Sequence, residues 1–315
     1  MIWGLVDDRT GHMSQVLGVI AKLGLPYQLK RLEFNALGRL LPNRLLGHSL
    51  MGVDRSHSTK LTPPWPDLVI AAGRRTVPVL RHIKSKSPTT RIVYLMWPGR
   101  AHGIDLIAAP VHDKPPARAN VLTTLAPLHA VTPEALASAA SAWQPAFAHL
   151  PRPYVMLTLG GDTKHGSYRP EDWRAVIEGA QALASGGSLL VTTSRRTPET
   201  AIALAKTLIT VPHWLHDWQE GKDNPYLGML GLADTIVVTG DSLSMCTEAC
   251  VAGKPVYIYA AEAMLPEKHR ALHRALYDRG MARPLDDTQS GPSWAPPAPL
   301  DEAADVAAEI QRRFL

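Results

Sequence analysis

Strand-like runs of apolar residues alternate with helix-like segments along almost the whole chain. Residues 2–6 have the pattern of a buried strand, and residues 14–23 carry a helical apolar stripe that Ser14 would cap. Such alternation predicts parallel sheets with right-handed crossover connections. The other predicted elements of this first series are strands at residues 27–32, 67–72, 91–96, 106–109 and 121–124, and a helix over 77–86.

Prolines interrupt the alternation near residue 150, where Pro145, Pro151 and Pro153 mark a linker, and the pattern then begins again. Two series predict an α/β protein with two Rossmann-like, doubly wound lobes and an interlobe cleft. We place the lobes at residues 1–150 and 151–315, and the last helix can pack back on the first lobe. The second series comprises strands at residues 154–159, 188–193, 236–239 and 256–259 and helices at 170–184, 198–208, 242–252 and 301–314.

Composition narrows the class of protein. Hydrophobic residues make up 45% of the 315 residues and charged residues 19%, which is typical of globular proteins. No run of about 18 apolar residues occurs, and the N-terminus lacks the features of a signal peptide. The two cysteines, Cys246 and Cys250, have no partners at zinc-site spacing, so we expect reduced core thiols and no metal. These features predict a cytoplasmic protein.

The charge is uneven. Residues 1–150 hold 17 Lys and Arg against 8 Asp and Glu, and the remainder of the chain holds 16 against 20. A basic first half suggests an anionic partner, such as a phospholipid surface or a lipid diphosphate, although a solvated basic surface is the simpler interpretation. Because no helix-turn-helix or zinc motif accompanies the charge, we do not expect nucleic acid as a partner.

The segment 37–51, LGRLLPNRLLGHSLM, places leucines beside Arg39, Arg44 and His48. Pro42 prevents one straight helix, so two short amphipathic pieces are expected. Two interpretations stay open. The leucines insert into the interfacial zone of an anionic membrane, which would make the protein peripheral at the inner face. Alternatively, they pack on the sheet of the first lobe while the arginines face water.

Ligands of doubly wound sheets bind beyond the carboxyl ends of the strands, so the loops there are the candidate sites. After the first strand comes Asp7-Asp8-Arg9-Thr10-Gly11-His12. His12 can act as a general base oriented by Asp7 or Asp8, or it is a solvated residue of a capping loop. We predict His12 and Asp8 as catalytic residues and, on the acceptor side, Gly11, Arg74 and Arg75.

Two loops of the second lobe suit phosphate. Gly160 and Gly161, with Asp162 and Thr163, follow the strand at 154–159, and paired glycines can expose backbone N–H groups to an anion. Neither a Walker loop nor GxGxxG occurs in the chain, so an ordinary turn is the alternative. The second loop is Thr192-Thr193-Ser194-Arg195-Arg196, after the strand at 188–193. Its hydroxyls and two arginines suit phosphate, unless it is a solvated loop that caps the next helix. From it we assign Thr193, Ser194 and Arg195 to the donor.

The strongest motif runs from Thr239 to Pro255 as strand, glycine turn, helix and Gly-x-Pro. Gly240 permits the turn, and polar residues then crowd a helix N-terminus, where free N–H groups attract phosphate. Glu248 lies about one turn beyond and can accept both hydroxyls of a ribose, unless it is an exposed residue of a plain capping sequence. The polar residues that we assign to a nucleotide-sugar donor with Glu248 are Asp241, Ser242 and Ser244.

This motif resembles the nucleotide-sugar segment of glycosyltransferase-B enzymes, and most closely that of the lipid-linked N-acetylglucosaminyltransferases of peptidoglycan synthesis. The resemblance implies that Glu248 holds the donor ribose, and the pair Gly11-His12 matches their early glycine–histidine loop in part.

A second resemblance covers nearly the whole chain. The segments DRTGH (8–12), PDLVIAAGRRT (66–76), DLIAAPVHD (105–113), GGDTKHG (160–166) and the run at 224–259 are similar to the mitochondrial-fission "elongated mitochondria" family. Its plant member is linked to organelle division.

Three hypotheses follow. The first is metal-independent transfer of a sugar from a nucleotide sugar to an anionic or lipid-linked acceptor, with no cofactor. The second is a nucleotide-sugar epimerase or hydrolase on the same fold. The third is a non-catalytic adaptor recruited to a membrane.

Overall fold

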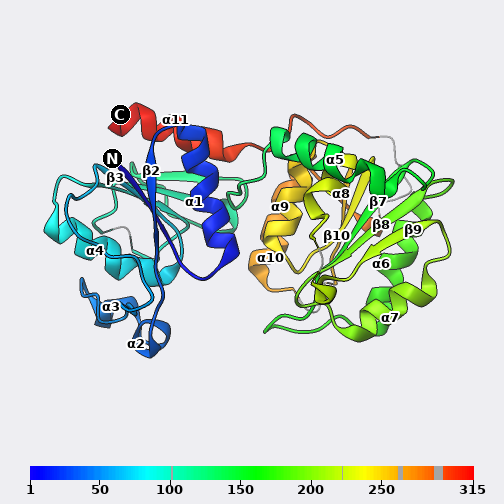
Figure 1. Ribbon diagram of the computed structural model, residues 1–315, viewed down its shortest axis with the longest axis horizontal. Coiled ribbons are helices and arrows are strands. Elements are labelled where there is room, and N and C mark those ends of the chain that lie inside the picture. Colours follow the sequence, from blue (N-terminus) through cyan, green and yellow to red (C-terminus); the bar gives the residue numbers. More distant parts are fainter. Residues whose placement is uncertain (101, 222, 262–264, 287–293) are drawn as a thin grey trace. The chain divides into compact units, whose positions relative to one another are not determined.

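The computed structural model describes residues 1–100, 102–221, 223–261, 265–286 and 294–315 (Figure 1). The chain forms two compact units. Unit 1 comprises Met1–Ala130 and Asp301–Leu315, and unit 2 comprises Val131–Leu300. The division falls at residue 130, earlier than the boundary at 150 suggested by the prolines.

The earlier boundary has a physical cause. Pro145, taken from the sequence as part of a linker, lies inside the helix α5 (Pro133–Phe147). This helix packs on α8 (Tyr226–Leu232), and its Phe147 ring lies edge-on to Trp214 with centroids 5.2 Å apart. Residues 133–147 are therefore part of the core of unit 2.

The sheet of unit 1 is entirely parallel, as the sequence predicted. The first strand, β1, has the second strand, β2, on one side, and all later strands follow on its other side. The direction of winding therefore reverses between β1 and β3. The strand order is β2 (Tyr27–Arg31), β1 (Ile2–Val6), β3 (Leu68–Ala71), β4 (Arg91–Leu95), β5 (Leu106–Pro110) and β6 (Val121–Thr124).

Helices cover both faces of this sheet (Figure 1). On one face, α1 (Thr10–Leu23) and α11 (Glu302–Phe314) share an apolar core with alternate strand residues. On the other face lies α4 (Val77–Lys86). The predicted cap at Ser14 was wrong, because α1 begins at Thr10 and the Ser14 Oγ accepts a hydrogen bond from the Ala130 N–H instead (2.9 Å).

The C-terminal helix α11 is fixed to unit 1 by packing and by its first residue. Val306 and Ile310 are fully buried against α1 and the sheet. The Glu302 carboxylate accepts hydrogen bonds from the backbone N–H groups of Leu125 and Ala126. The two ends of the chain thus build one hydrophobic core.

Two short helices, α2 (Ala36–Leu40) and α3 (Asn43–Leu46), flank Pro42, which confirms the prediction of two short pieces in this segment. Two 3₁₀ turns complete unit 1, η1 (Arg74–Thr76) and η2 (Val111–Asp113).

Unit 2 also contains one parallel sheet, whose winding reverses between β7 and β10. When the six strands are numbered from β7 as the first to β12 as the sixth, their order in the sheet, from β9 to β12, is 3-2-1-4-5-6. This order is typical of dinucleotide-binding sheets. The strand order is β12 (Arg283–Pro284), β11 (Val256–Tyr259), β10 (Thr235–Thr239), β7 (Tyr154–Leu159), β8 (Ser188–Thr193) and β9 (His213–His216).

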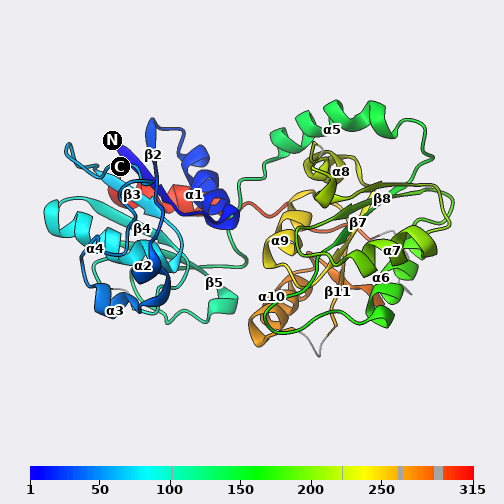
Figure 2. The same ribbon diagram turned by 60° about the horizontal axis from the view of Figure 1, so that its bottom comes forward.

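Four helices and a 3₁₀ turn surround this sheet together with α5 and α8 (Figure 2). The sequence reading missed α5, α8, α10, β9 and β12. The four helices are α6 (Pro170–Leu183), α7 (Glu199–Leu208), α9 (Leu243–Val251) and α10 (Glu267–Asp278), and the 3₁₀ turn is η3 (Trp218–Glu220).

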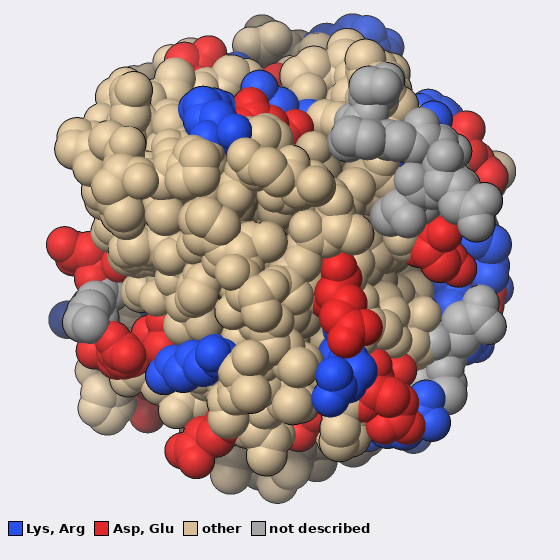
Figure 3. Space-filling model, turned by 90° about the vertical axis from the view of Figure 1, so that its right-hand side faces the viewer, with Lys and Arg blue, Asp and Glu red and all other residues tan. Residues whose placement is uncertain are grey.

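Seen from the side of the edge strand β9, unit 2 has few charged residues over the middle of its surface (Figure 3).

Within the described ranges, no helix is long and apolar enough to cross a membrane. Cys246 and Cys250 are buried free thiols, and no group of three potential metal ligands occurs among the described residues.

Because Ile310 is fully buried, we expect Ile310→Ala to lower the free energy of unfolding by about 2–5 kcal/mol through lost burial and a residual cavity. Urea denaturation followed by circular dichroism measures the change. The neighbouring exposed residue provides the control, since Gln311→Ala should change the unfolding free energy by less than about 0.5 kcal/mol. Equal effects of the two substitutions would contradict the packing of α11.

Candidate functional site

In each unit, polar side chains gather at the carboxyl ends of the strands where the winding reverses. In a parallel sheet the connections leave in opposite directions at such a point, which opens a crevice for ligands. In unit 1 this point lies between β1 and β3, and in unit 2 between β7 and β10.

In unit 1, His12 and Asp7 form a hydrogen-bonded pair, with His12 Nδ1 2.9 Å from Asp7 Oδ1. The Asp7 side chain is 1% exposed and that of His12 is 14% exposed. Burial alone would raise the pKa of Asp7, but the hydrogen bond and charge from His12 and the backbone N–H of Arg9 outweigh it, so the pKa is lowered. Asp7 is therefore an ionised acceptor that fixes the imidazole.

Gly73, at the end of β3, makes room for this pair. Its φ of +93° favours glycine, and a Cβ at this position would lie 2.6 Å from His12 Nδ1 and 3.0 Å from Asp7 Oδ2. With Nδ1 held by Asp7, Nε2 is the ring nitrogen available to exchange a proton. This is the arrangement by which a carboxylate orients a histidine general base.

The structure places the other predicted residues of unit 1 in different roles. Asp7, not Asp8, orients His12, and the exposed Asp8 carboxylate pairs with Arg75 (3.2 Å). Gly11 lies in the first turn of α1. The Arg74 guanidinium donates to the backbone carbonyls of Arg39 and Leu41, so it fixes the end of α2.

In unit 2, the Asp241 carboxylate connects three loops. Asp241 is 3% exposed, and its Oδ2 accepts from Gly161 N (3.1 Å) and Arg196 Nη2 (2.6 Å). The Tyr168 hydroxyl donates to Oδ1 (3.2 Å). Burial, and then the charge of Asp241, raises the pKa of Tyr168. Asp241 therefore cannot meet a ligand phosphate; it joins the loops that follow β7, β8 and β10.

The predicted anion-binding concavity at the paired glycines was wrong. Gly160 N donates to Thr239 Oγ1 (2.7 Å) and Gly161 N donates to Asp241, so the protein itself uses both N–H groups. The glycines are needed for close approach instead. A Cβ at Gly160 would lie 2.1 Å from Asp241 Oδ1, and one at Gly161 would lie 1.9 Å from the carbonyl oxygen of Arg196.

Four of the predicted residues line one cavity of about 180 Å³. Thr193, Ser194 and Arg195 come from the end of β8 and the loop beyond it, and Glu248 comes from α9. The other walls are Thr192, Trp218, Asn224, Tyr226 and Met245. Thr192 and Met245 belong to candidate loops predicted from the sequence, and Asn224 and Tyr226 fall inside a segment that marked the family resemblance. Trp218 was missed, because it lies in none of these segments.

The side chains around this cavity are positioned by hydrogen bonds. Thr193 Oγ1 accepts from the Trp218 N–H (2.9 Å), and Ser194 Oγ donates to the Gly160 carbonyl (3.1 Å). Arg195 is exposed and has no hydrogen bond or ion pair to other described residues, so its guanidinium is available to an anion.

Glu248 is the titratable group of the cavity. Burial raises the pKa of its carboxyl to about 7, and the neighbouring Tyr226 hydroxyl lowers it by a smaller amount. Burial likewise raises the pKa of Tyr226 well above its usual value, so this phenol stays a hydrogen-bond donor. A carboxyl held half-protonated near neutral pH gains from a ligand that donates hydrogen bonds to it.

The other residues that were predicted to bind the nucleotide-sugar donor do not line this cavity. Ser242 caps α9 by accepting from Met245 N (3.3 Å), and Ser244 is exposed on the same helix. Gly240 N donates to the Tyr259 carbonyl in the turn after β10. Asp162 and Thr163 belong to a tight turn, where Thr163 bonds to Gly166.

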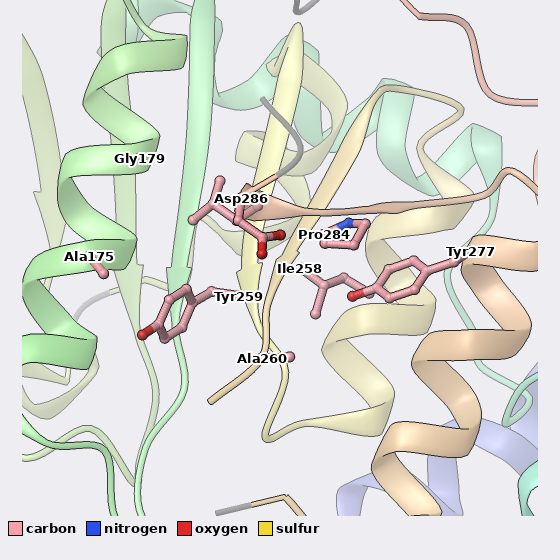
Figure 4. Close-up of a pocket in the computed structure, with 9 residues that line it drawn as sticks. Ala175, Gly179, Ile258, Tyr259, Ala260, Tyr277, Pro284 and Asp286 are labelled. Atoms are coloured by element: carbon pink, nitrogen blue, oxygen red, sulfur yellow. The ribbon is translucent and has the colours of Figure 1, made fainter. Parts of the chain in front are cut away.

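A larger cavity of about 530 Å³ lies in unit 2 between α6, α10 and the strands β11 and β12 (Figure 4). Its walls are mainly apolar, and the Tyr259 hydroxyl donates to Asp172 Oδ1 (3.0 Å). Two of its lining residues, Ile258 and Tyr259, fall inside the segment 224–259 that marked the family resemblance, and no Lys or Arg of the described residues lines it.

Residues 10–314 match the family described as Mitochondrial fission ELM1. The chain belongs to this family. The mitochondrial fission protein ELM1 of Arabidopsis thaliana is 30% identical over 79% of this chain, which spans 64% of the plant protein's length. "Uncharacterized protein RP120" of Rickettsia prowazekii is 27% identical over 98% of this chain and 97% of its own length.

Solved structures share the fold at low identity. UDP-GlcNAc 2-epimerase from Neisseria meningitidis bound to UDP-GlcNAc gives a TM-score of 0.51 at 12% identity, covering 99% of this chain and 92% of its own. MurG of Acinetobacter baumannii gives 0.52 at 15%, covering 98% and 94%. The glycotransferase of kitacinnamycin gives 0.53 at 12%, covering 100% and 99%. The fold is that of glycosyltransferase-B enzymes and related epimerases.

The raised pKa of Glu248 predicts a pH-dependent stability. As pH rises from 4.5, the unfolded chain loses its proton first, so the folded protein loses stability until the pH passes about 7. Glu248→Gln should therefore be more stable than the wild type by about 1–3 kcal/mol at pH 8, and this gain should shrink toward pH 4.5. Thermal denaturation across this range measures the difference, and a gain independent of pH would show that Glu248 is not desolvated.

Proposed function

We propose that this protein transfers a sugar from a nucleotide-sugar donor to a hydroxyl of an anionic or lipid-linked acceptor. The observation that carries the proposal is the cavity at the carboxyl edge of the unit 2 sheet, where the Glu248 carboxyl lies between Tyr226 and the loop after β8. A carboxylate in this position suits the two vicinal hydroxyls of a ribose, each of which can donate one hydrogen bond.

Unit 2 also contains groups that can bind the negative charge of the donor diphosphate. Arg195 extends from the loop after β8, and the first N–H groups of α9 follow the turn at Gly240. No Asp-x-Asp motif occurs in the sequence, so the proposal assigns these groups, and no metal ion, to the diphosphate.

The proton transfer is assigned to unit 1. His12 Nε2 takes the proton of the acceptor hydroxyl, and the acceptor oxygen attacks the anomeric carbon of the sugar. The bond from that carbon to the diphosphate oxygen breaks, and the nucleoside diphosphate leaves. Asp7 holds the imidazole and stabilises the imidazolium that forms.

An epimerase is the second candidate, because several of the similar structures are UDP-GlcNAc 2-epimerases. Analysis of the products separates the two activities. A transferase releases a nucleoside diphosphate only when acceptor is present, whereas an epimerase converts the nucleotide sugar without any acceptor. The non-catalytic adaptor of the third hypothesis would bind no nucleotide.

Binding tests the donor site. We expect UDP-GlcNAc, the nucleotide sugar bound in one similar structure, to bind the wild type, and Glu248→Ala to lose about 1.5–3 kcal/mol of binding free energy measured by calorimetry. Affinity should rise as pH increases through 7, since the ionised carboxyl is the better acceptor. Other nucleotide sugars are tested in parallel.

The matched control is Glu178→Ala on α6, which removes an exposed glutamate outside the cavity and should leave affinity unchanged. If wild type and Glu248→Ala bound the nucleotide sugar with equal affinity, the assignment of the ribose to this cavity would be wrong.

Turnover tests the base. His12→Ala should reduce the rate of sugar transfer to a bacterial lipid extract by roughly 10²–10⁴-fold while donor affinity stays within twofold. Asp7→Asn should also slow turnover, whereas Asp8→Asn, which changes an exposed carboxylate, should leave it near the wild-type rate. Full turnover in His12→Ala would exclude this histidine from the mechanism.

A further inference from the structure

A second polar cavity, of about 320 Å³, lies in unit 1 away from the His12–Asp7 pair. Its walls come from the end of α3, one side of α4 and the loop at residues 102–103. None of the described residues that line it is acidic. The side chains that line it are His48, Arg81, Lys84, Ser85 and His102.

Arg81 lacks the partners that a half-buried guanidinium normally has. Its Nε is buried without a hydrogen bond, and no ion pair or hydrogen bond joins its side chain to another described residue. Lys84 differs, since its Nζ donates to Thr90 O (2.7 Å) and pairs with Asp105 Oδ2 (3.0 Å). A half-buried cation without a counter-ion makes this cavity favourable for an anion.

Exposed apolar side chains occur in the segment 37–51, which also contributes Gly47 and His48 to the cavity. The segment 37–51 divides its leucines between two roles, because Leu46 is buried and Leu50 packs against the core of unit 1. Leu40 is 80% exposed and Leu45 is 65% exposed, and Leu37 and Met51 are exposed with them.

The short helices that carry these side chains are fixed in place. The helix α3 packs on α4, and His82 Nδ1 lies 3.1 Å from the backbone oxygen of His48. Leu45 on α3 and Arg81 on α4 therefore belong to adjacent helices. The candidate surface comprises the cavity and the exposed side chains of the segment 37–51.

Positive charge predominates in the part of the chain that carries this surface. Residues 36–86 contain nine Lys and Arg and only two Asp and Glu. Arg39 and Arg44 are exposed between the leucines. Leucines would gain nothing from a nucleic-acid backbone, whereas leucines beside arginines suit the interfacial zone of an anionic bilayer.

We propose that this surface docks unit 1 on a bilayer containing anionic phospholipid, with a headgroup phosphate in the Arg81 cavity and Leu37, Leu40, Leu45 and Met51 in the interfacial zone. The docking is independent of nucleotide binding and of sugar transfer, so its failure leaves the proposed function untouched. It assigns a role to Arg81, which takes part in neither the His12–Asp7 pair nor the Glu248 cavity.

Co-sedimentation of the full chain with vesicles tests the docking. We expect binding to vesicles of phosphatidylcholine mixed with phosphatidylglycerol, little binding to phosphatidylcholine alone, and weaker binding as salt rises. Arg81→Gln should reduce the partition coefficient about fivefold, and the double variant Leu40→Ser, Leu45→Ser should reduce it at least tenfold.

The control substitution is Arg118→Gln, which removes an exposed arginine outside this surface and should change the partition coefficient less than twofold. Because Leu40 and Leu45 are exposed, unchanged thermal denaturation should confirm that the double variant is folded. Equal binding to both kinds of vesicle, or full binding of both the Arg81 and the leucine variants, would overturn the proposal. The proposal would also be overturned if the protein bound inorganic phosphate in calorimetry but did not bind anionic vesicles.

Discussion

The buried carboxylate of Asp241 organises the carboxyl edge of the unit 2 sheet. It receives hydrogen bonds from the Gly161 backbone and the Tyr168 hydroxyl, which lie in the connection after β7, and from the Arg196 guanidinium, which lies in the connection after β8. A buried charge is costly unless it is paired and fully hydrogen-bonded, and these three donors meet that requirement. These contacts fix the loop after β8 at Arg196. The residues directly before Arg196, Thr193 to Arg195, line the cavity that also contains Glu248.

The sequence predicted the sheets well because parallel strands buried on both faces are continuous apolar runs. The strands at residues 2–6, 121–124, 154–159, 188–193 and 256–259 have the predicted bounds. Elements with weaker patterns were missed. The strand β9 lies at an edge and has mixed polar residues, and α5 contains Pro145, which in a sequence alone indicates a break.

The positions of the polar loops could be predicted more reliably than the contacts that their residues make. The loops after β7 and β10 could be identified because glycines and polar residues follow buried strands. Whether their N–H groups meet a ligand or the protein depends on contacts across about eighty positions of sequence, such as Gly161 N to Asp241, and no local pattern reports these. The same holds for Asp7 and Asp8, two adjacent carboxylates of which the fold turns one inward to His12 and the other outward to Arg75.

The two titratable groups of the candidate sites differ in what they contribute to the stability of the fold. The Glu248 carboxyl is desolvated with its pKa raised to about 7, so at higher pH its charge destabilises the ligand-free fold. The buried Asp7–His12 pair differs, because the lowered pKa of Asp7 means that the fold stabilises its ionised carboxylate. Neither group is needed for a surface that only recruits a partner. A ligand that donates hydrogen bonds to the Glu248 carboxylate, as the proposed nucleotide sugar would, should stabilise the folded state when it binds.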